Sequence, residues 1–271
     1  MAISIFAKPY FISNDGRLMR GTSMIRGEQI AKQVGAKLNP QSGYQDDVCI
    51  YVKPYTQPPY DFQFEGRPYL DVIDTYKFIE VAKAHPEVTV IACSVADQGT
   101  LSKVIDNPVI LIPQHHCNFE RLKRDRDKVV TVGAISNPSA ITYLPDNLPK
   151  RLSEVGLNFL AYSDFKERTD VVDFYKKIDI QIIWRPWKAE LSNPLKMINA
   201  ATFGIPSVAY DEDGFREMAG CYVPVQTADE LIARIENLTS SPETYSDYAE
   251  KCFEKAEEYH IENIGRLYKD L

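Results

Sequence analysis

The sequence predicts an α/β protein of two doubly wound, Rossmann-like domains. Short apolar runs alternate with helical patterns along most of the chain, as expected for parallel strands joined by helices. Several of these runs are apolar on both faces, which is typical of strands covered by helices on each side. The chain has 271 residues, enough for two domains of about 120 to 150 residues each.

The elements follow in order from this alternation. We expect strands at residues 3–7, 47–52, 88–93, 108–113, 128–133, 157–162, 178–184 and 205–210. Helical patterns cover residues 23–35, 70–85, 170–178, 194–204 and 228–238. Residues 53–69, rich in Tyr, Phe and Pro, are expected to form one long loop, and loops of that length are often binding loops.

A polar and charged segment at residues 114–127 divides the chain. We therefore expect a first domain at 1–118, a second domain at 119–245 and a helical tail at 246–271. The tail has a partial apolar stripe suited to packing on a domain surface.

Composition narrows the classes of partner. The formal net charge of −7 argues against nucleic acid or an anionic membrane as the main partner, although a local basic cluster can hold a small anion. No run approaches 18 apolar residues, so no transmembrane span is expected. The first residues are interpreted as a strand rather than a signal peptide. Five scattered cysteines without CxxC spacing indicate reduced thiols in a cytoplasmic protein, with no disulfide framework or zinc site.

The segment LSNPLKMINAATFGIPSVAY at 191–210 begins with a helix start. Ser192 or Asn193 is a suitable N-cap, and Pro194 fits the first helical position. The free N–H groups of such a start favour a bound anion. An ordinary capped helix is the alternative on local chemistry alone.

Three cations surround that helix start. Arg185 and Lys188 follow the strand 178–184 at its carboxyl end, where ligands bind in open α/β sheets. Lys196 lies in the first turn of the helix. Together these side chains suit a diphosphate, since Arg can bind an anion in a bidentate manner. Solvated surface cations are the alternative.

The residues after this helix carry a family resemblance. Gly204-Ile205-Pro206 precedes an apolar strand, and Gly214 and Glu217 form a Gly-x-x-Glu pattern beyond it. This order resembles the nucleotide-sugar half of GT-B glycosyltransferases, particularly glycosyltransferase family 4. The resemblance covers residues 128–260 well and residues 1–118 only in outline.

The resemblance implies two Rossmann-like domains facing a cleft, with a C-terminal helix that crosses back to the first domain. It implies metal-independent transfer of a sugar from a nucleotide-diphosphate sugar to an acceptor hydroxyl, with retention of configuration and without a cofactor. Gly133 would face the cleft. The expected catalytic residues are His116, Arg185 and Glu217. The expected donor-binding residues are Gly133, Arg185, Lys188, Ser192, Asn193, Lys196, Asn199, Gly214 and Glu217.

Two departures from the family pattern favour an alternative. Asn199 stands where a glutamate that contacts the donor ribose is usual, and the Arg and Lys that usually follow the first strand of the second domain are missing. A non-catalytic nucleotide- or sugar-binding protein, or a partner subunit on the same fold, is therefore the second hypothesis. A different α/β enzyme on this frame is the third, because a fold alone does not determine function.

The first half offers a second helix start, at Gly21, Thr22 and Ser23, with Arg26 nearby. In a GT-B protein this loop can contact donor phosphate or acceptor, although a simple helix cap explains it almost as well. Asp74 is a further acceptor-site candidate near the start of the helix at 70–85.

His115 and His116 follow a strand at the expected exit from the first domain. Either could contact a sugar or act as acid or base. Neighbouring residues on a strand point in opposite directions, so at most one should face the cleft. A polar linker with one buried histidine is the alternative. The sequence Asp211-Glu212-Asp213 matches the metal-binding D-x-D of GT-A transferases, and we interpret it as a coincidence, so no metal is expected.

Overall fold

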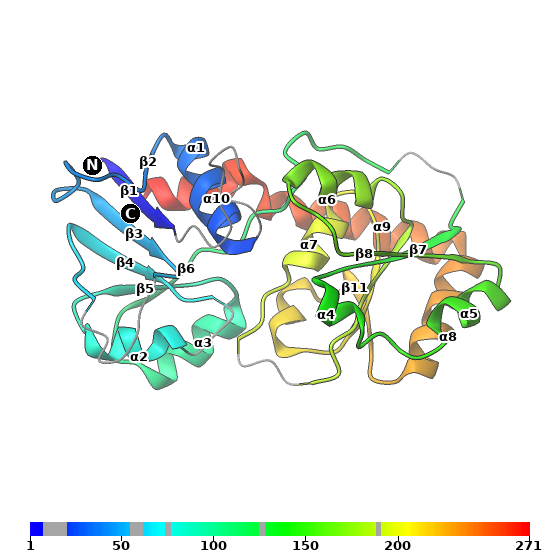
Figure 1. Ribbon diagram of the computed structural model, residues 1–271. Coiled ribbons are helices and arrows are strands. Elements are labelled where there is room, and N and C mark those ends of the chain that lie inside the picture. Colours follow the sequence, from blue (N-terminus) through cyan, green and yellow to red (C-terminus); the bar gives the residue numbers. More distant parts are fainter. Residues whose placement is uncertain (8–20, 55–61, 74–76, 125–127, 188–190) are drawn as a thin grey trace. The chain divides into compact units, whose positions relative to one another are not determined.

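The computed structural model describes residues 1–271 except 8–20, 55–61, 74–76, 125–127 and 188–190 (Figure 1). The chain forms two compact units, each with its own parallel sheet. Unit 1 contains residues 1–115, 189–193 and 261–271, and unit 2 contains residues 116–188 and 194–260. Two doubly wound domains are thus confirmed.

Unit 1 has a six-stranded sheet in the order β2-β1-β3-β4-β5-β6, and the paired strands are parallel. Its strands are β1 (Ile3–Ala7), β2 (Lys37–Leu38), β3 (Val48–Val52), β4 (Arg67–Asp71), β5 (Thr89–Ala92) and β6 (Val109–Leu111). Its helices are η1 (Ser23–Gln29), α1 (Ile30–Val34), α2 (Lys77–Ala84), α3 (Val95–Val104) and α10 (Ile261–Lys269).

The centre of the unit 1 sheet is apolar on both faces. All five residues of β3 are buried, and Ile50 pairs in register with Ile5 of β1 and Tyr69 of β4. On one face, α2 and α3 contribute Val81 and Leu101 to a core cluster in which both are fully buried. This is the burial that a run without alternating polarity predicts.

Unit 2 has a five-stranded parallel sheet in the order β11-β10-β9-β7-β8. Its strands are β7 (Thr131–Ile135), β8 (Asn158–Tyr162), β9 (Ile180–Ile183), β10 (Ser207–Tyr210) and β11 (Tyr222–Val225). Its helices are α4 (Pro138–Ile141), α5 (Leu148–Glu154), α6 (Arg168–Tyr175), α7 (Leu195–Ala201), η2 (Asp213–Met218), α8 (Ala228–Ser240), α9 (Pro242–Ala256) and η3 (Glu257–Tyr259).

Asp179, just before β9, fixes the start of the neighbouring strand β7. Its buried carboxylate accepts the backbone N–H groups of Val130 and Thr131, both at 2.8 Å, and the Arg124 Nε–H at 2.9 Å. Its own carbonyl accepts the Tyr245 hydroxyl of α9 at 2.7 Å. One acidic side chain therefore aligns the two strands at the centre of the sheet.

The C-terminal segment is helical and returns to unit 1, as predicted. It is not one helix, because His260 is extended (φ −64°, ψ 144°) and separates η3 from α10. In unit 1, α10 packs beside α1 (Figure 1). Gly265 permits a close approach, since a Cβ there would lie 3.0 Å from Gln33 Cγ.

Three strands were not predicted, and one of them changes the interpretation of a site. The expected loop at 53–69 ends in strand β4, which runs to Asp71. Asp71 is therefore the last residue of a strand and not part of a helix start. Pro68 and Arg67 made this segment resemble a loop. The other two unpredicted strands are the short edge strands β2 and β11.

The segment at 114–127 was expected to be a polar linker, yet its first residues are buried. Gln114, His115, His116 and Asn118 are all at most 4% exposed. Buried polar residues need hydrogen-bond partners, and three of these residues have partners distant in sequence: His115 contacts the Ile25 carbonyl, and His116 and Asn118 contact Thr202. Among the described residues, no helix is long and apolar enough to cross a membrane.

Candidate functional site

The carboxyl edge of the unit 2 sheet carries the candidate site. Strands β7, β9 and β10 are neighbours and end at Ile135, Ile183 and Tyr210. The three segments that follow these strands therefore begin at the same edge of the sheet. Open α/β sheets bind ligands at this edge. Two of the predicted cations, Arg185 and Lys196, lie at this edge.

Lys196 reaches the end of strand β7. It is exposed in the first turn of α7, and its Nζ donates to the Ser136 hydroxyl at 2.7 Å. The Lys196 carbonyl accepts the hydroxyl of buried Tyr175 at 3.1 Å, which anchors that turn to α6. The cation is thus held at the sheet edge by a neutral partner from another loop.

Arg185 is engaged by a carboxylate. Its Nε donates to Glu212 Oε1 at 2.9 Å, and its Nη2 donates to Glu212 Oε2. The Glu212 side chain is only 7% exposed, whereas Arg185 is 32% exposed. The acidic run at 211–213, interpreted from sequence as a coincidence, thus contains the partner of the main predicted anion ligand. Spacing alone does not reveal such a pair.

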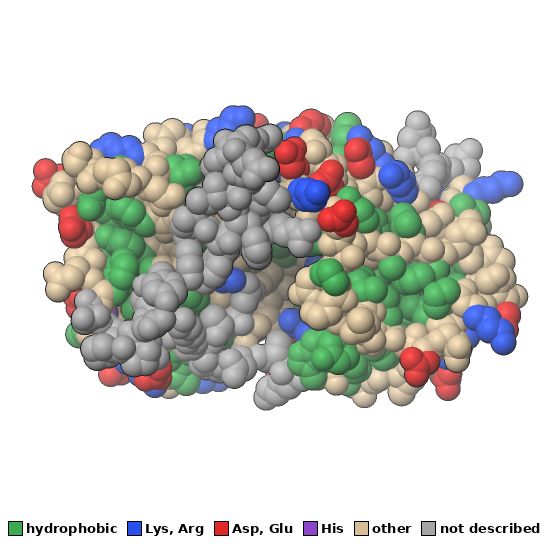
Figure 2. All heavy atoms as spheres, in the orientation of Figure 1, with side chains coloured by type: hydrophobic (Ala, Val, Ile, Leu, Met, Phe, Trp, Pro, Cys, Tyr) green, Lys and Arg blue, Asp and Glu red, His purple; other side chains and the backbone are tan. Residues whose placement is uncertain are grey.

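Two exposed aromatic side chains form a further part of this edge that the sequence analysis missed. Tyr143 follows α4 and Trp187 follows β9, and their ring centroids lie 4.5 Å apart in an edge-to-face arrangement. They are 55% and 41% exposed. Figure 2 shows that hydrophobic side chains are exposed on the face of unit 2 that it draws. The two tryptophans in Trp184-Arg185-Pro186-Trp187 were the only available signal, because the distance between the rings depends on the fold.

The predicted cap of helix α7 is wrong. The N-cap position is Pro194, without a side-chain hydrogen bond, and the helix has seven residues. Ser192 belongs with Asn193 to unit 1. There the Ser192 N–H donates to Asp97 Oδ1 and its carbonyl accepts the Ser94 hydroxyl, both at 2.8 Å. Ser192 therefore does not cap α7, because its backbone is hydrogen-bonded to Asp97 and Ser94 of unit 1 instead.

Asn199 holds the backbone of unit 2. It is 8% exposed, and its Oδ1 accepts the Cys117 N–H at 2.8 Å. The residue at the place of the usual glutamate thus has a structural contact.

Gly214 and Glu217 lie in the short helix η2, where Gly214 is buried. Glu217 Oε1 accepts the Tyr259 hydroxyl at 3.2 Å. Burial, and then the charge of Glu217, raise the pKa of Tyr259 above its ordinary value. Tyr259 therefore stays protonated and can orient the carboxylate.

Gly133 does not face a ligand cleft, so that prediction is wrong. A Cβ at this position would lie 2.4 Å from Ile178 Cγ2 and 2.9 Å from Phe174 Cζ. These atoms belong to the core of unit 2. The glycine is required because these side chains pack directly against the strand.

The two adjacent histidines are both buried, and they belong to different units. In unit 1, His115 is 2% exposed and its Nε2 lies 2.9 Å from the Ile25 carbonyl. In unit 2, His116 is 1% exposed. Its Nδ1 accepts the Asn118 N–H at 3.2 Å, and its Nε2 lies 3.4 Å from the Thr202 hydroxyl. An acid or base must reach its substrate, so the predicted catalytic role of His116 is not supported.

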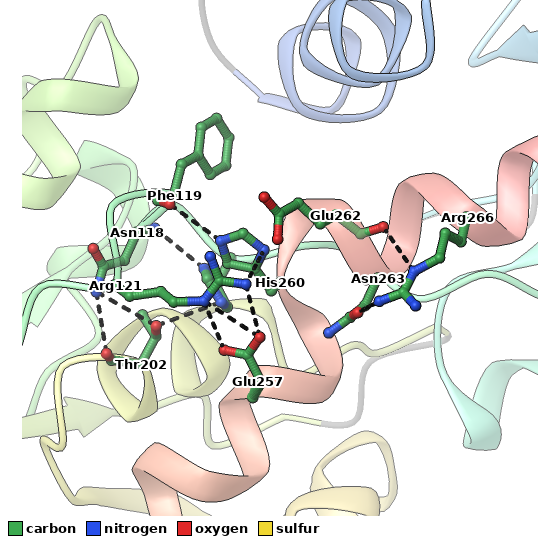
Figure 3. A network of polar contacts seen from close by, with 10 residues as sticks. Asn118, Phe119, Arg121, Thr202, Glu257, His260, Glu262, Asn263 and Arg266 are labelled. Carbon is green, nitrogen blue, oxygen red and sulfur yellow. Dashed lines mark hydrogen bonds and ion pairs between the residues drawn. The ribbon is translucent and has the colours of Figure 1, made fainter.

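A polar network in unit 2 includes Asn118, Arg121 and His260 (Figure 3), and His116 takes part in it through Asn118 and Thr202. The ring of His260 lies edge-to-face against that of His116, with centroids 5.2 Å apart. Arg121 Nη2 lies 3.1 Å from His260 Nδ1, and Arg121 Nε and Nη2 donate hydrogen bonds to the Glu257 carboxylate. His260 Nε2 lies 3.1 Å from the Phe119 carbonyl. This network stabilises the buried segment that the sequence predicted to be a linker.

Comparisons with known proteins give the fold a name. A variant of TarM from S. aureus, solved with fondaparinux, α-GlcNAc-glycerol and UDP, has a TM-score of 0.64 at 13% identity over 83% of this chain. HepE from Anabaena, solved with UDP and glucose, has a TM-score of 0.62 at 11% identity, covering 100% of this chain and 98% of HepE. A glycosyltransferase from Rickettsia africae has a TM-score of 0.61 at 12% identity, with 99% and 98% coverage.

The chain has the GT-B fold. It spans just over half the length of TarM, of which 54% and 55% are covered in two structures. No protein-family model matches the sequence, and no curated protein matches it either. These likenesses therefore support the fold that the sequence predicted.

The sequence predicts a second anion site at the helix start after β1, at Gly21, Thr22 and Ser23. Gly21 has a positive φ of 69°, and Thr22 caps η1 without a side-chain hydrogen bond. Arg26 is only 1% exposed, and its Nε donates to Asp71 Oδ2 at 2.5 Å. Arg26 is therefore not a surface cation for phosphate.

Two predicted site residues, Asp74 and Lys188, lie outside the described residues. Among the residues that are described, no group of three or more His, Cys, Asp or Glu side chains could hold a metal ion. All five cysteines are buried free thiols. The described cations at the sheet edge of unit 2 are thus the candidates for binding a diphosphate.

Proposed function

We propose that this chain is a glycosyltransferase that moves a sugar from a nucleotide-diphosphate sugar to an acceptor hydroxyl. The observation that carries the proposal is Lys196, an exposed cation held by Ser136 at the carboxyl edge of a parallel sheet. The GT-B fold supports it, since HepE of the same fold was solved with UDP and glucose.

In the proposed reaction, cations of the chain stabilise the charge of the leaving nucleoside diphosphate. Departure of the sugar leaves negative charge on the nucleoside diphosphate, and a preorganised cation stabilises that charge. Lys196 supplies such a cation, and Arg185 supplies a second one when it exchanges Glu212 for phosphate. Lys188 is the third proposed cation. We propose that this set replaces a metal ion.

The remaining roles concern sugar, base and acceptor. Glu217, oriented by Tyr259, is proposed to accept hydrogen bonds from a hydroxyl of the ribose or the donor sugar. Tyr143 and Trp187 offer exposed rings of the kind on which nucleobases stack. Unit 1 is proposed to bind the acceptor. Retention of configuration follows if the mechanism of the resembled family applies.

The contact between Arg185 and Glu212 favours a second candidate function. A carboxylate that already neutralises the main anion ligand reduces the stabilisation available to a leaving diphosphate. A protein that binds a nucleotide sugar without transferring it needs less of that stabilisation. A non-catalytic nucleotide- or sugar-binding protein, or a partner subunit, is the alternative that this pair supports.

The first experiment is a thermal-shift panel with UDP, GDP, dTDP and ADP sugars, followed by a donor-hydrolysis assay. Stabilisation by one nucleotide class together with sugar release supports the transferase. Stabilisation without release, both alone and with a panel of hydroxyl acceptors, supports the binding protein. If no nucleotide sugar stabilises the chain, both functions are wrong.

The second experiment locates the anion site. Lys196→Ala should weaken nucleoside-diphosphate affinity by about 10- to 100-fold, the range of one charge-assisted hydrogen bond. Lys251→Ala is the control, because it removes an exposed cation of α9 that pairs with Asp247. Equal affinities for both variants would place the diphosphate elsewhere.

A further inference from the structure

Among the described residues of unit 1, three side chains of the helices η1 and α10 each have a buried polar atom without a hydrogen-bond partner. These atoms are Ser23 Oγ and Arg26 Nη2 in η1 and Tyr268 Oη in α10. Their residues are 4%, 1% and 0% exposed. About 90% or more of buried polar groups have a partner in protein or ordered water. Three such atoms, on helices η1 and α10, are an exception that needs a physical explanation.

The three side chains come from two helices of unit 1. Ser23 and Arg26 both lie in the short π-helix η1. Arg26 Cζ lies 5.9 Å from the centroid of the Tyr268 ring. Arg26 also donates to Asp71, the last residue of β4, and to the carbonyl of Ile112 after β6 at 3.0 Å. The cluster is thus fixed at the carboxyl edge of the unit 1 sheet.

Charge defines the ligand that this cluster accepts. Arg26 is already paired with Asp71 at 2.5 Å, so a bound phosphate would add a buried negative charge without a further cation of this cluster to offset it. Burial keeps the pKa of Tyr268 above its ordinary value, so its oxygen remains a neutral hydroxyl. Arg26 Nη2 can only donate, whereas Ser23 and Tyr268 can donate or accept. A neutral oxygen that both accepts and donates satisfies all three atoms.

We propose that a neutral hydroxyl oxygen, from a water molecule or from the hydroxyl of a bound sugar or polyol, occupies a site formed by Ser23, Arg26 and Tyr268. The site accounts for the buried Arg26 that the sequence analysis assigned to phosphate. It lies within unit 1 and does not depend on the proposed function.

The test uses the sign of a stability change in the full chain. If a ligand is hydrogen-bonded to the hydroxyl, deleting the hydroxyl removes that bond and lowers the stability of the chain. If the hydroxyl has no partner, deleting it removes an uncompensated desolvation cost and raises the stability. Ser23→Ala and Tyr268→Phe should therefore each lower the urea midpoint of unfolding. Tyr245→Phe calibrates the Tyr268 result, because it deletes a buried hydroxyl whose partner is the Asp179 carbonyl. A midpoint that is unchanged or higher in both test variants would overturn the proposal.

A second measurement does not depend on the variants. A crystal structure of the full chain should show an electron-density peak within hydrogen-bond distance of Arg26 Nη2 and of at least one of the two hydroxyls. Protein atoms that satisfy these groups, or an empty site, would refute the site. Crystals grown with and without glycerol then distinguish the two sources, since a polyol extends beyond a single peak and a water does not.

Solution data separate the sources in the same way. The thermal shift produced by glycerol or glucose should be larger in the wild-type chain than in Ser23→Ala and Tyr268→Phe if a polyol hydroxyl binds. Equal shifts in all three proteins, with a single peak in the crystal, identify the oxygen as water.

Discussion

Arg185 and Glu212 form a two-point ion pair across neighbouring strand ends of unit 2. Arg185 follows β9 and Glu212 follows β10. A guanidinium group forms the same kind of bidentate hydrogen bonds with a phosphate as with a carboxylate. A diphosphate at this edge must therefore compete with Glu212 for Arg185.

Removing that competition should strengthen binding. We expect Glu212→Gln to raise the affinity for nucleoside diphosphates by about 3- to 30-fold, since the charged partner of a charge-assisted bond becomes neutral. Isothermal titration calorimetry at fixed salt measures the change.

The matched control for this prediction is Asp213→Asn. It removes one negative charge from the next residue, which is exposed and pairs with Arg216. A general electrostatic effect would strengthen binding equally in both variants. Unchanged or weaker binding by Glu212→Gln would show that the diphosphate does not contact Arg185.

The parallel sheets could be predicted because their signal is local. Strands such as β3 and β9 are short apolar runs, and burial on both faces needs no distant information. Strand β4 could not be predicted in this way. Its first residues, Arg67 and Pro68, resemble a loop, and only pairing with β3 and β5 makes the segment a strand.

The candidate site was predictable only in part, because side-chain partners are set by the fold. The sequence placed Arg185 and Lys196 at a strand end and a helix start, which is where the structure has them. It could not show that Ser192 bonds to Asp97 or that Glu212 lies against Arg185. Burial of His116 also depends on distant residues, because its partners include Thr202.

His116 should prove to be a stability residue. His116→Ala removes two buried hydrogen-bond partners and leaves a cavity, so it should lower the free energy of unfolding by about 2–4 kcal/mol. If transfer activity is found, turnover per folded molecule should stay within about threefold, because losing a true acid or base costs about 100-fold or more. Urea denaturation and steady-state kinetics test this together. A large loss of turnover at wild-type stability would restore the catalytic role.

Gly133 and Gly99 provide a matched pair of Gly→Ala substitutions. Gly133→Ala places a Cβ 2.4 Å from Ile178 Cγ2, so overpacking should cost about 1–3 kcal/mol of unfolding free energy. Gly99→Ala, within α3, meets no atom within 4 Å and should add about 0.5–1 kcal/mol, because alanine favours the helix. Chemical denaturation of both variants gives the comparison. Similar values for the two would mean that Gly133 is not packed as described.

Asp47 should make the stability of unit 1 sensitive to acid. Its carboxylate accepts hydrogen bonds from Lys37 Nζ at 2.8 Å and Ser4 Oγ at 2.6 Å, and these bonds hold the pKa of Asp47 below its ordinary value. The unfolded carboxyl therefore binds a proton more readily than the folded one. Its contribution is complete above the unfolded pKa of about 4 and is lost as the pH falls through the lower folded pKa.

Asp47→Asn should accordingly be less stable than the wild type at pH 7, and the difference should shrink as the pH falls below about 4. Urea midpoints measured from pH 7 to pH 3 follow this change directly. Asp46→Asn, at the exposed neighbouring position, controls for the loss of one negative charge. A difference between wild type and Asp47→Asn that stays constant across this pH range would contradict the assignment, because a neutral asparagine cannot titrate and the wild-type carboxylate must.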